Sequence, residues 1–200
     1  MLPTTAMYTS IIVEDILQEL IIRKLMEHYG CNVAAKFYCS GGKGKILNKL
    51  DNYRRAAQNS PFIVCIDLDN SPCAPNLIQQ YSMQGPNANF LLRIMVREVE
   101  AWILADRTNS ARLLGVAAAN IPHNTEEIED PKEFLVNLAK QGNKKTVKDL
   151  IPIGCGKVGP GYNTILGKFI NNTWNPDQAR QHNHSLDRAI ERIKEFFNIN

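Results

Sequence analysis

The chain has 200 residues, of which 44% are hydrophobic and 22% charged, and this balance excludes a largely disordered protein. No apolar run approaches the roughly 20 residues of a membrane span, and the N-terminal MLPTTAMYTS lacks the basic start and cleavage pattern of a signal peptide, so we expect a cytoplasmic protein with no membrane partner. The formal net charge of +3 is compatible with a nucleic-acid partner without requiring one.

Strands and helices alternate in the first half of the sequence. Apolar and β-branched runs predict strands at 8–13, 32–39, 62–68 and 89–96. Apolar residues at helical spacing predict helices at 16–26, 46–57 and 97–105, and the glycine-bearing segment 40–44 is predicted to be a loop. This alternation predicts an α/β fold of Rossmann-like type, with a mostly parallel sheet of about four strands and helices on both faces.

The second half is predicted to be helical. Asp130-Pro131 and Asn175-Pro176 each have the form of an N-cap followed by proline at the first helical position. Further helices are expected at 163–170 and from residue 186 onward, the last of them capped by Ser185. We therefore expect an α/β core at 1–107 and a helical C-terminal region at 108–200 packed on it.

Carboxylates stand at the predicted ends of two strands. Asp67 and Asp69 close the segment FIVCIDLDN, and residues two apart point to the same side of an extended strand, while Leu68 should point into the core. Glu14 follows the first strand, which neighbours the third in a sheet of order 2-1-3, with the ligand crevice between their carboxyl ends. Converging carboxylates repel one another, and Mg²⁺ is a natural counter-charge. The alternative is that both aspartates only cap the following turn.

A further acidic pair, Glu98 and Glu100, stands where the fourth strand becomes a helix. Residues two apart on a helix diverge, so we expect at most one of them to face the crevice and the other to meet solvent or a basic neighbour. The alternative is that both only stabilise the start of the helix through their negative charge.

The same residues carry a resemblance. A glutamate after the first strand (Glu14), a glycine-bearing loop after the second and a DxD motif after the third (Asp67 and Asp69) form a layout that resembles the TOPRIM fold of topoisomerases, primases and OLD-type nucleases. This match covers roughly the first half of the chain. Nearly the whole chain resembles the DUF4276 family of uncharacterised bacterial proteins, through the segments VEDILQELIIRKLM, RIMVREVEAWILADR, GPGYN, WNPDQAR and HSLDRAIERI.

The TOPRIM resemblance implies a role for each of the three acidic residues. Glu14 matches the glutamate that acts as general acid or base or as a metal ligand, and Asp67 and Asp69 match the magnesium ligands. Asp15 stands where many TOPRIM proteins have glycine, and we expect no tyrosine-bearing topoisomerase domain. The implied activity is a small Mg²⁺- or Mn²⁺-dependent nuclease of the OLD type, in defence or repair. OLD-type enzymes often work with an ATPase, which here would be a separate polypeptide because the chain has no GxxxxGK[ST] motif.

Such chemistry would be phosphodiester hydrolysis, with one ion at Asp67 and Asp69 and a second near Glu14 and one of Glu98 and Glu100. Basic side chains would position the nucleic-acid backbone, although each is more often a solvated surface charge. The candidates are Lys43, Lys45, Arg54, Arg55, Lys144, Lys145, Lys148 and Lys157. Lys157 belongs to a GxGxxG match that does not open a βαβ unit, so it indicates a loop that leads into a helix, with a phosphate site as a weaker hypothesis.

Two other functions remain open at this point. One is a non-catalytic, metal-binding regulatory or assembly subunit. The other is a phosphatase that resembles the haloacid dehalogenase superfamily, whose hhhhDxD motif normally ends the first strand and not the third. The five cysteines never form a CxxC pair, and His182 and His184 have no nearby partner ligand, so neither a disulfide framework nor a zinc site is indicated.

Overall fold

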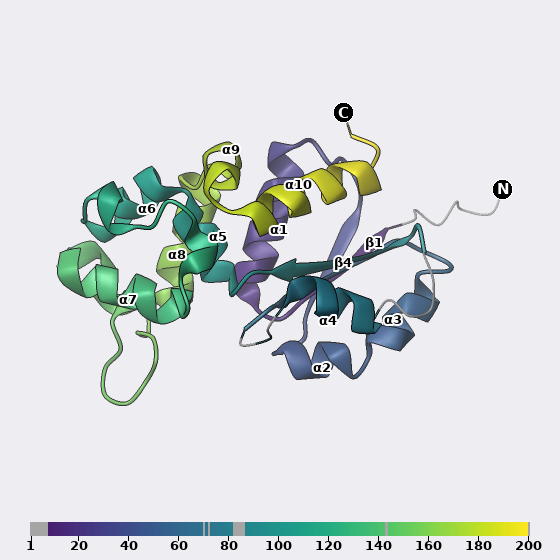
Figure 1. Cartoon of the computed structure of the whole chain (residues 1–200), viewed down its shortest axis with the longest axis horizontal. Helices are drawn as coiled ribbons and strands as arrows, with labels where there is room; N and C mark the ends of the chain where they lie inside the picture. Colours follow the sequence, from purple (N-terminus) through teal and green to yellow (C-terminus); the bar gives the residue numbers. More distant parts are fainter. Residues whose placement is uncertain (1–7, 70, 72, 82–86, 143, 200) are drawn as a thin grey trace.

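The computed structural model describes residues 8–69, 71, 73–81, 87–142 and 144–199. Its centre is a sheet of parallel strands in the order β2-β1-β3-β4 (Figure 1). The strands are β1 (Thr9–Val13), β2 (Ala35–Cys39), β3 (Phe62–Asp67) and β4 (Phe90–Met95). The predicted α/β class, the parallel sheet and the 2-1-3 order of the first three strands are confirmed.

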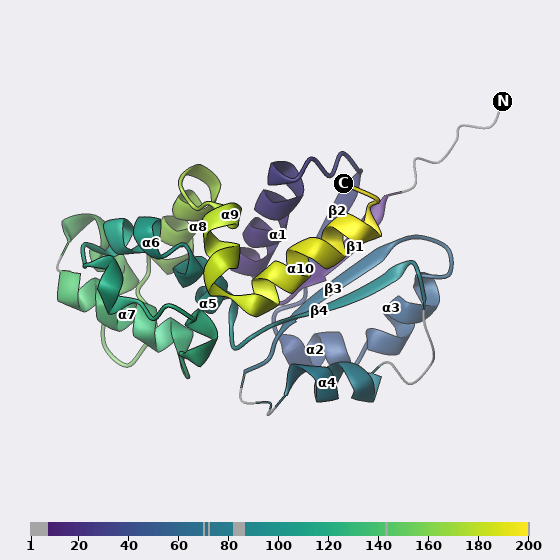
Figure 2. The same ribbon diagram turned by 45° about the horizontal axis from the view of Figure 1, so that its top comes forward.

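Helices cover both faces of the sheet. On one face lie α1 (Ile16–His28) and α10 (His184–Phe196), and on the other lie α2 (Lys43–Leu47), α3 (Leu50–Ala56) and α4 (Ala74–Tyr81), as Figures 1 and 2 show. Successive strand residues point to opposite faces, so Ile63 packs into the core under α1 and Val64 into the smaller core over α2 and α3. The burial of β1 and β3 on both faces explains the apolar runs that mark these two strands in the sequence.

The second half of the chain is helical in its described part and contains no strand there. Its helices are α5 (Val99–Ala105), α6 (Arg107–Leu114), α7 (Pro131–Gly142), α8 (Tyr162–Asn172) and α9 (Pro176–Ala179), with short 3-10 turns at Ala118–Asn120, Thr125–Glu127, Lys145–Leu150 and Arg180–His182. We call α5–α9 the helical lobe. Figure 1 shows it beyond the carboxyl ends of the strands, so this edge of the sheet faces the lobe.

Most predicted boundaries hold to within two residues, but several need correction, among them the start of the strand expected at 32–39, which begins at Ala35. The helix expected at 46–57 is two helices, and the first begins at Lys43 inside the predicted loop. α4 was not predicted. β3 ends at Asp67, and the helix expected from residue 97 begins at Val99.

The predicted helix caps are correct in two of three cases. Asp130 accepts a hydrogen bond from the Glu133 N–H (2.8 Å), and Asn175 caps α9. α10 is capped by Asn183 and not by Ser185, whose hydroxyl instead accepts a hydrogen bond from Trp102 Nε1 (2.8 Å). The serine thus ties the start of α10 to α5.

In the part of the chain that the structure describes, no helix combines the length and the apolar surface that a bilayer crossing requires.

Candidate active site

The carboxyl ends of β1 and β3 bring two predicted residues together. Glu14 directly follows β1, and Asp67 is the last residue of the neighbouring strand β3. The Asp67 backbone N–H donates a hydrogen bond to Glu14 Oε1 (2.7 Å). Asp67 is only 7% exposed, so its carboxylate lies almost entirely inside the protein.

Gln18, on the first turn of α1, holds both of these acidic residues. Its Nε2 donates to Asp67 Oδ1 (2.9 Å), and its Oε1 accepts from the Glu14 backbone N–H (2.9 Å). Asp15 is the N-cap of α1 and accepts from the N–H groups of Leu17 and Gln18. Its φ of −144° is extended backbone that any residue adopts, so the chain does not need glycine at this position.

Asp69 reaches the site in a different way from the one predicted. Because β3 ends at Asp67 and Asp69 has φ 51°, the two side chains are not successive positions on one face of a strand. The Asp69 carboxylate pairs with Lys43 Nζ (3.1 Å), and that ammonium also donates to the Leu68 carbonyl oxygen (2.9 Å). Leu68 itself is buried in the core, as expected.

Glu98 and Glu100 both turn toward one lysine. We expected at most one of them to face the crevice, but Glu98 is the extended N-cap of α5 and not part of the helix, so the two side chains do not diverge. Lys132 Nζ lies 3.8 Å from Glu98 Oε1 and 3.6 Å from Glu100 Oε1. Tyr162 donates its hydroxyl hydrogen to Glu100 Oε1 (2.9 Å), and Glu100 Oε2 is buried without a hydrogen-bond partner among the described residues.

The electrostatics of the cluster favour a proton or a cation. Burial raises the pKa of Asp67 well above its ordinary value, and the carboxylates of Glu14 and Glu100 add to the shift. Burial also raises the pKa of Glu14, although the Asp67 backbone N–H opposes this. The pKa of Glu100 rises to about 7 because of its burial, against the opposing charge of Lys132. The site therefore holds more carboxylates than its two lysines neutralise.

The donor chemistry fits a hard divalent cation, because the acidic groups at this edge of the sheet are all carboxylates, whose oxygens such ions prefer. Across the described ranges, however, no group of three or more His, Cys, Asp or Glu side chains is arranged to hold a metal ion. An ion here would take one or two carboxylates and complete its shell with water and substrate phosphate, as Mg²⁺ commonly does.

The predicted basic residues are widely distributed. Lys43 is the one that contacts the acidic cluster, whereas Lys45 and Arg55 are exposed on α2 and α3. Arg54 is 9% exposed and its guanidinium lies 5.5 Å from the centre of the Phe90 ring, away from the site.

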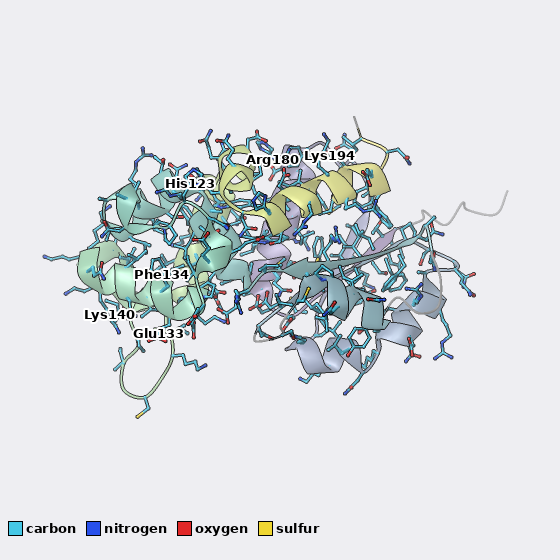
Figure 3. All side chains as sticks on the ribbon, viewed as in Figure 1. His123, Glu133, Phe134, Lys140, Arg180 and Lys194 are labelled. Atoms are coloured by element: carbon cyan, nitrogen blue, oxygen red, sulfur yellow. The ribbon has the colours of Figure 1, made fainter. Side chains whose placement is uncertain are left out.

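Lys157 lines a cleft of about 340 Å³ between α7 and the segment 152–157, and Glu98 and Lys132 form the end of that cleft nearest the carboxylates. Figure 3 labels two more of its lining residues, Glu133 and Lys140, on α7.

Three residues of the cluster were not predicted: Gln18, Lys132 and Tyr162. Tyr162 lies in GPGYN, one of the segments in which the sequence resembles the DUF4276 family, and no role was predicted for that segment. Gln18 stands four residues after Glu14, one helical turn into α1, and that spacing is the available signal. Lys132 carries no signal beyond its place at the start of a helix.

No family model matches the sequence, and comparisons with curated proteins and with solved structures find no match.

Proposed function

We propose that the protein is a metal-dependent nuclease, similar to TOPRIM nucleases of the OLD type, that hydrolyses phosphodiester bonds in nucleic acid. The observation that supports this most is the junction of Glu14 and Asp67. They come from adjacent parallel strands, lie among further carboxylates, and stand at the sheet edge where open α/β sheets bind their ligands.

Asp67 and Asp69 would hold Mg²⁺ or Mn²⁺. When bound there, the ion supplies positive charge to a phosphate oxygen and lowers the pKa of bound water. Gln18 fixes the Asp67 carboxylate through its 2.9 Å hydrogen bond, and Lys43 fixes Asp69. Glu14, whose pKa burial raises, would accept or return the proton that moves when water attacks phosphorus.

A second ion at Glu98 and Glu100 is not part of this proposal. Lys132 already places its ammonium within 4 Å of both carboxylates and would repel an ion close to them. At the proposed site, by contrast, Lys43 pairs only with Asp69, and no ammonium among the described residues pairs with Asp67. The proposal is therefore a site for one ion, and Lys132 provides the second positive charge.

A non-catalytic subunit is the second candidate function. Lys43 and Lys132 each pair with carboxylates of the cluster, and ion pairs of this kind also serve in purely structural sites. The phosphatase alternative has less support. Its nucleophile would be Asp67, which is 7% exposed and accepts a hydrogen bond from Gln18 at the oxygen Oδ1.

The setting we propose is the cytoplasm, with a separate ATPase as a partner. All five cysteines are unpaired, as is usual for proteins of the reducing cytoplasm. Burial raises the pKa of Cys65 to about 12, which keeps that thiol protonated and inert.

The proposal is tested by metal titration and by DNA cleavage with isosteric variants. Wild type should bind Mn²⁺ in calorimetry and nick circular DNA only when Mg²⁺ or Mn²⁺ is present. Asp67→Asn should lose both properties. Glu14→Gln should lower the cleavage rate by about 10²- to 10⁴-fold, the usual contribution of a general base, while it keeps the metal.

Glu27→Gln is the matched control, because Glu27 is an exposed glutamate on the same helix, α1, and should cleave like wild type. Equal Mn²⁺ affinity in wild type and Asp67→Asn would show that the site is wrong. Metal binding without cleavage would favour the non-catalytic subunit, and phosphate release from small phosphomonoesters through an aspartyl-phosphate would favour the phosphatase.

A further inference from the structure

A groove of about 830 Å³ lies on the sheet face that carries α2 and α3. We call it the aromatic groove. It is lined by residues of β1, β2 and β3 and of the segment that carries α2 and α3, among them Tyr38, Lys45, Lys49, Tyr53 and Phe62. Its volume lies in the range of about 300 to 1,000 Å³ that is usual for ligand pockets.

The groove exists because the helices cover only part of this sheet face. α2 and α3 pack over β1 and β3 through Ile46 and Leu50. The part of the face formed by the edge strand β2 has no described helix over it (Figure 1), and Tyr38 on β2 is 39% exposed. An exposed aromatic ring therefore lines the groove, and so do Tyr53 of α3 and Phe62 of β3, whose rings stack on each other with centres 6.2 Å apart.

The charge of the groove is positive. Lys45 and Lys49 are lining residues, and Lys36 extends its ammonium to 5.5 Å from the centre of the Tyr38 ring. None of the described residues that line the groove is an aspartate or a glutamate. An anionic ligand is thus favoured.

The groove adjoins the candidate active site. Its lining residues Cys39 and Ser40 form the carboxyl end of β2, and the next residue, Gly41, donates its N–H to the carbonyl oxygen of Glu14 (2.9 Å). The short helix α2 connects the two places as well, because Lys43 pairs with Asp69 while Lys45 lines the groove.

We propose that the aromatic groove binds single-stranded nucleic acid and leads it to the carboxylates at Glu14 and Asp67. Rings that accept stacked bases, alternating with lysines that pair with phosphates, are the features by which proteins bind single strands without strong sequence preference. This inference rests on the proposed nuclease function and adds the substrate class. The stacking partners are Tyr38 and Tyr53, and the phosphate contacts are Lys45 and Lys49.

Binding is tested without cleavage, by fluorescence anisotropy of a labelled 12-nucleotide thymidine strand in EDTA at low salt. Wild type should bind the strand, and Tyr38→Ala should weaken the affinity by about 5- to 150-fold, the loss expected for one stacked base. Tyr38→Phe keeps the ring and should bind like wild type. Lys49→Ala should also weaken binding and reduce its dependence on salt.

Lys168→Ala is the matched control for charge, because Lys168 is exposed on α8 and does not line the groove. Unchanged affinity of Tyr38→Ala, or equal loss for Lys49→Ala and Lys168→Ala, overturns the proposal. Equal affinity for a 12-base-pair duplex overturns the single-strand assignment. A dimer that Tyr38→Ala dissociates in sedimentation shows instead that a second copy of the chain covers the groove.

Because EDTA removes divalent ions, this experiment separates the two proposals. Strand binding that depends on Tyr38, without metal-dependent cleavage, supports the groove and contradicts the nuclease. Cleavage that depends on Asp67 but not on Tyr38 supports the nuclease and contradicts the groove.

Discussion

At the scale of single residues, Glu100 is the most unusual group in the molecule. It is fully buried, and its Oε1 receives a hydrogen bond from Tyr162 while its Oε2 has no partner in the described part of the chain. A buried carboxylate that is not fully hydrogen-bonded costs stability when it is ionised. Buried carboxylates of this kind are commonly found at sites of binding or catalysis.

The cost predicts a specific dependence of stability on pH. The pKa of Glu100 is about 7 in the folded protein against an ordinary value of 4.5, so the folded state binds this proton more tightly than the unfolded state. The stabilisation that the Glu100 proton gives to the folded state is complete below pH 4.5 and is lost as the pH rises through 7. Relative to Glu100→Gln, the wild-type free energy of unfolding should fall by up to about 3 kcal/mol across this window.

Urea unfolding at several pH values from 4 to 8 measures this difference. Glu129→Gln, which changes an exposed glutamate, should follow the wild-type curve throughout. If the curves of Glu100→Gln and wild type run parallel, Glu100 does not hold a proton in the folded state.

Sequence patterns identified Glu14 and Asp67 because each follows an apolar run that is easily recognised as a strand. Gln18, Lys132 and Tyr162 escaped because their roles depend on contacts with residues far away in the sequence. The hydrogen bond from Gln18 to Asp67 spans 49 positions and that from Tyr162 to Glu100 spans 62. A single sequence carries no local signal of such pairings.

At the scale of secondary-structure elements, the turn before α8 determines where Tyr162 lies. The Gly159 N–H donates to the Leu150 carbonyl oxygen (2.9 Å), which folds the turn tightly against the 3-10 turn Lys145–Leu150. A Cβ atom at Gly159 would stand 2.2 Å from the Asp149 carbonyl oxygen, so no larger residue fits without a shift of the backbone. This close approach accounts for the first glycine of GPGYN.

We therefore expect Gly159→Ala to lower the free energy of unfolding by about 1 to 3 kcal/mol, as overpacking usually does. Gly156→Ala is a control in the same segment, because its Cβ would meet its nearest neighbour at 3.4 Å, an ordinary van der Waals distance. It should change stability by no more than about 0.5 kcal/mol. Equal effects of the two substitutions in urea unfolding would contradict the close-approach argument.

The elements that sequence analysis missed have physical reasons of their own. The predicted helix 46–57 is divided because the chain bends between Leu47 and Leu50, and both resulting helices still direct an apolar residue into the same core. α4 went unrecognised because it is only eight residues long, although Ala74, Leu77, Ile78 and Tyr81 stand at helical spacing and pack against the core on that face of the sheet. β1 and β3 were recognised because burial on both faces leaves an unbroken apolar run.

At the scale of the whole molecule, the sheet and the helical lobe share one core. α8 packs against α1, and α10 packs along β4. The indole N–H of Trp174 donates to the Trp102 carbonyl oxygen (3.2 Å), which joins α5 to the segment just before α9. The apolar face of α1, which includes Leu17 and Ile21, belongs to the same cluster as Leu166 of α8.

A shared core predicts that the boundary at residue 107 does not separate two independently stable units. The full chain should unfold in one transition, with tryptophan fluorescence and far-ultraviolet circular dichroism following the same curve. A fragment of residues 1–107 should show no cooperative transition, because α1 would lose the apolar surface that α8 covers. A sharp transition in that fragment, or two separated transitions in the full chain, would contradict this.

The place of β2 at the end of the sheet order has one more consequence. No described strand pairs with its outer side, so its backbone hydrogen-bonding groups there are available to another extended chain. Only five residues long and bearing the charged Lys36, this strand has two features by which natural proteins discourage edge-to-edge aggregation. Lys36, whose ammonium lies beside the Tyr38 ring of the groove, thus also helps to keep separate copies of the protein from joining into a continuous sheet.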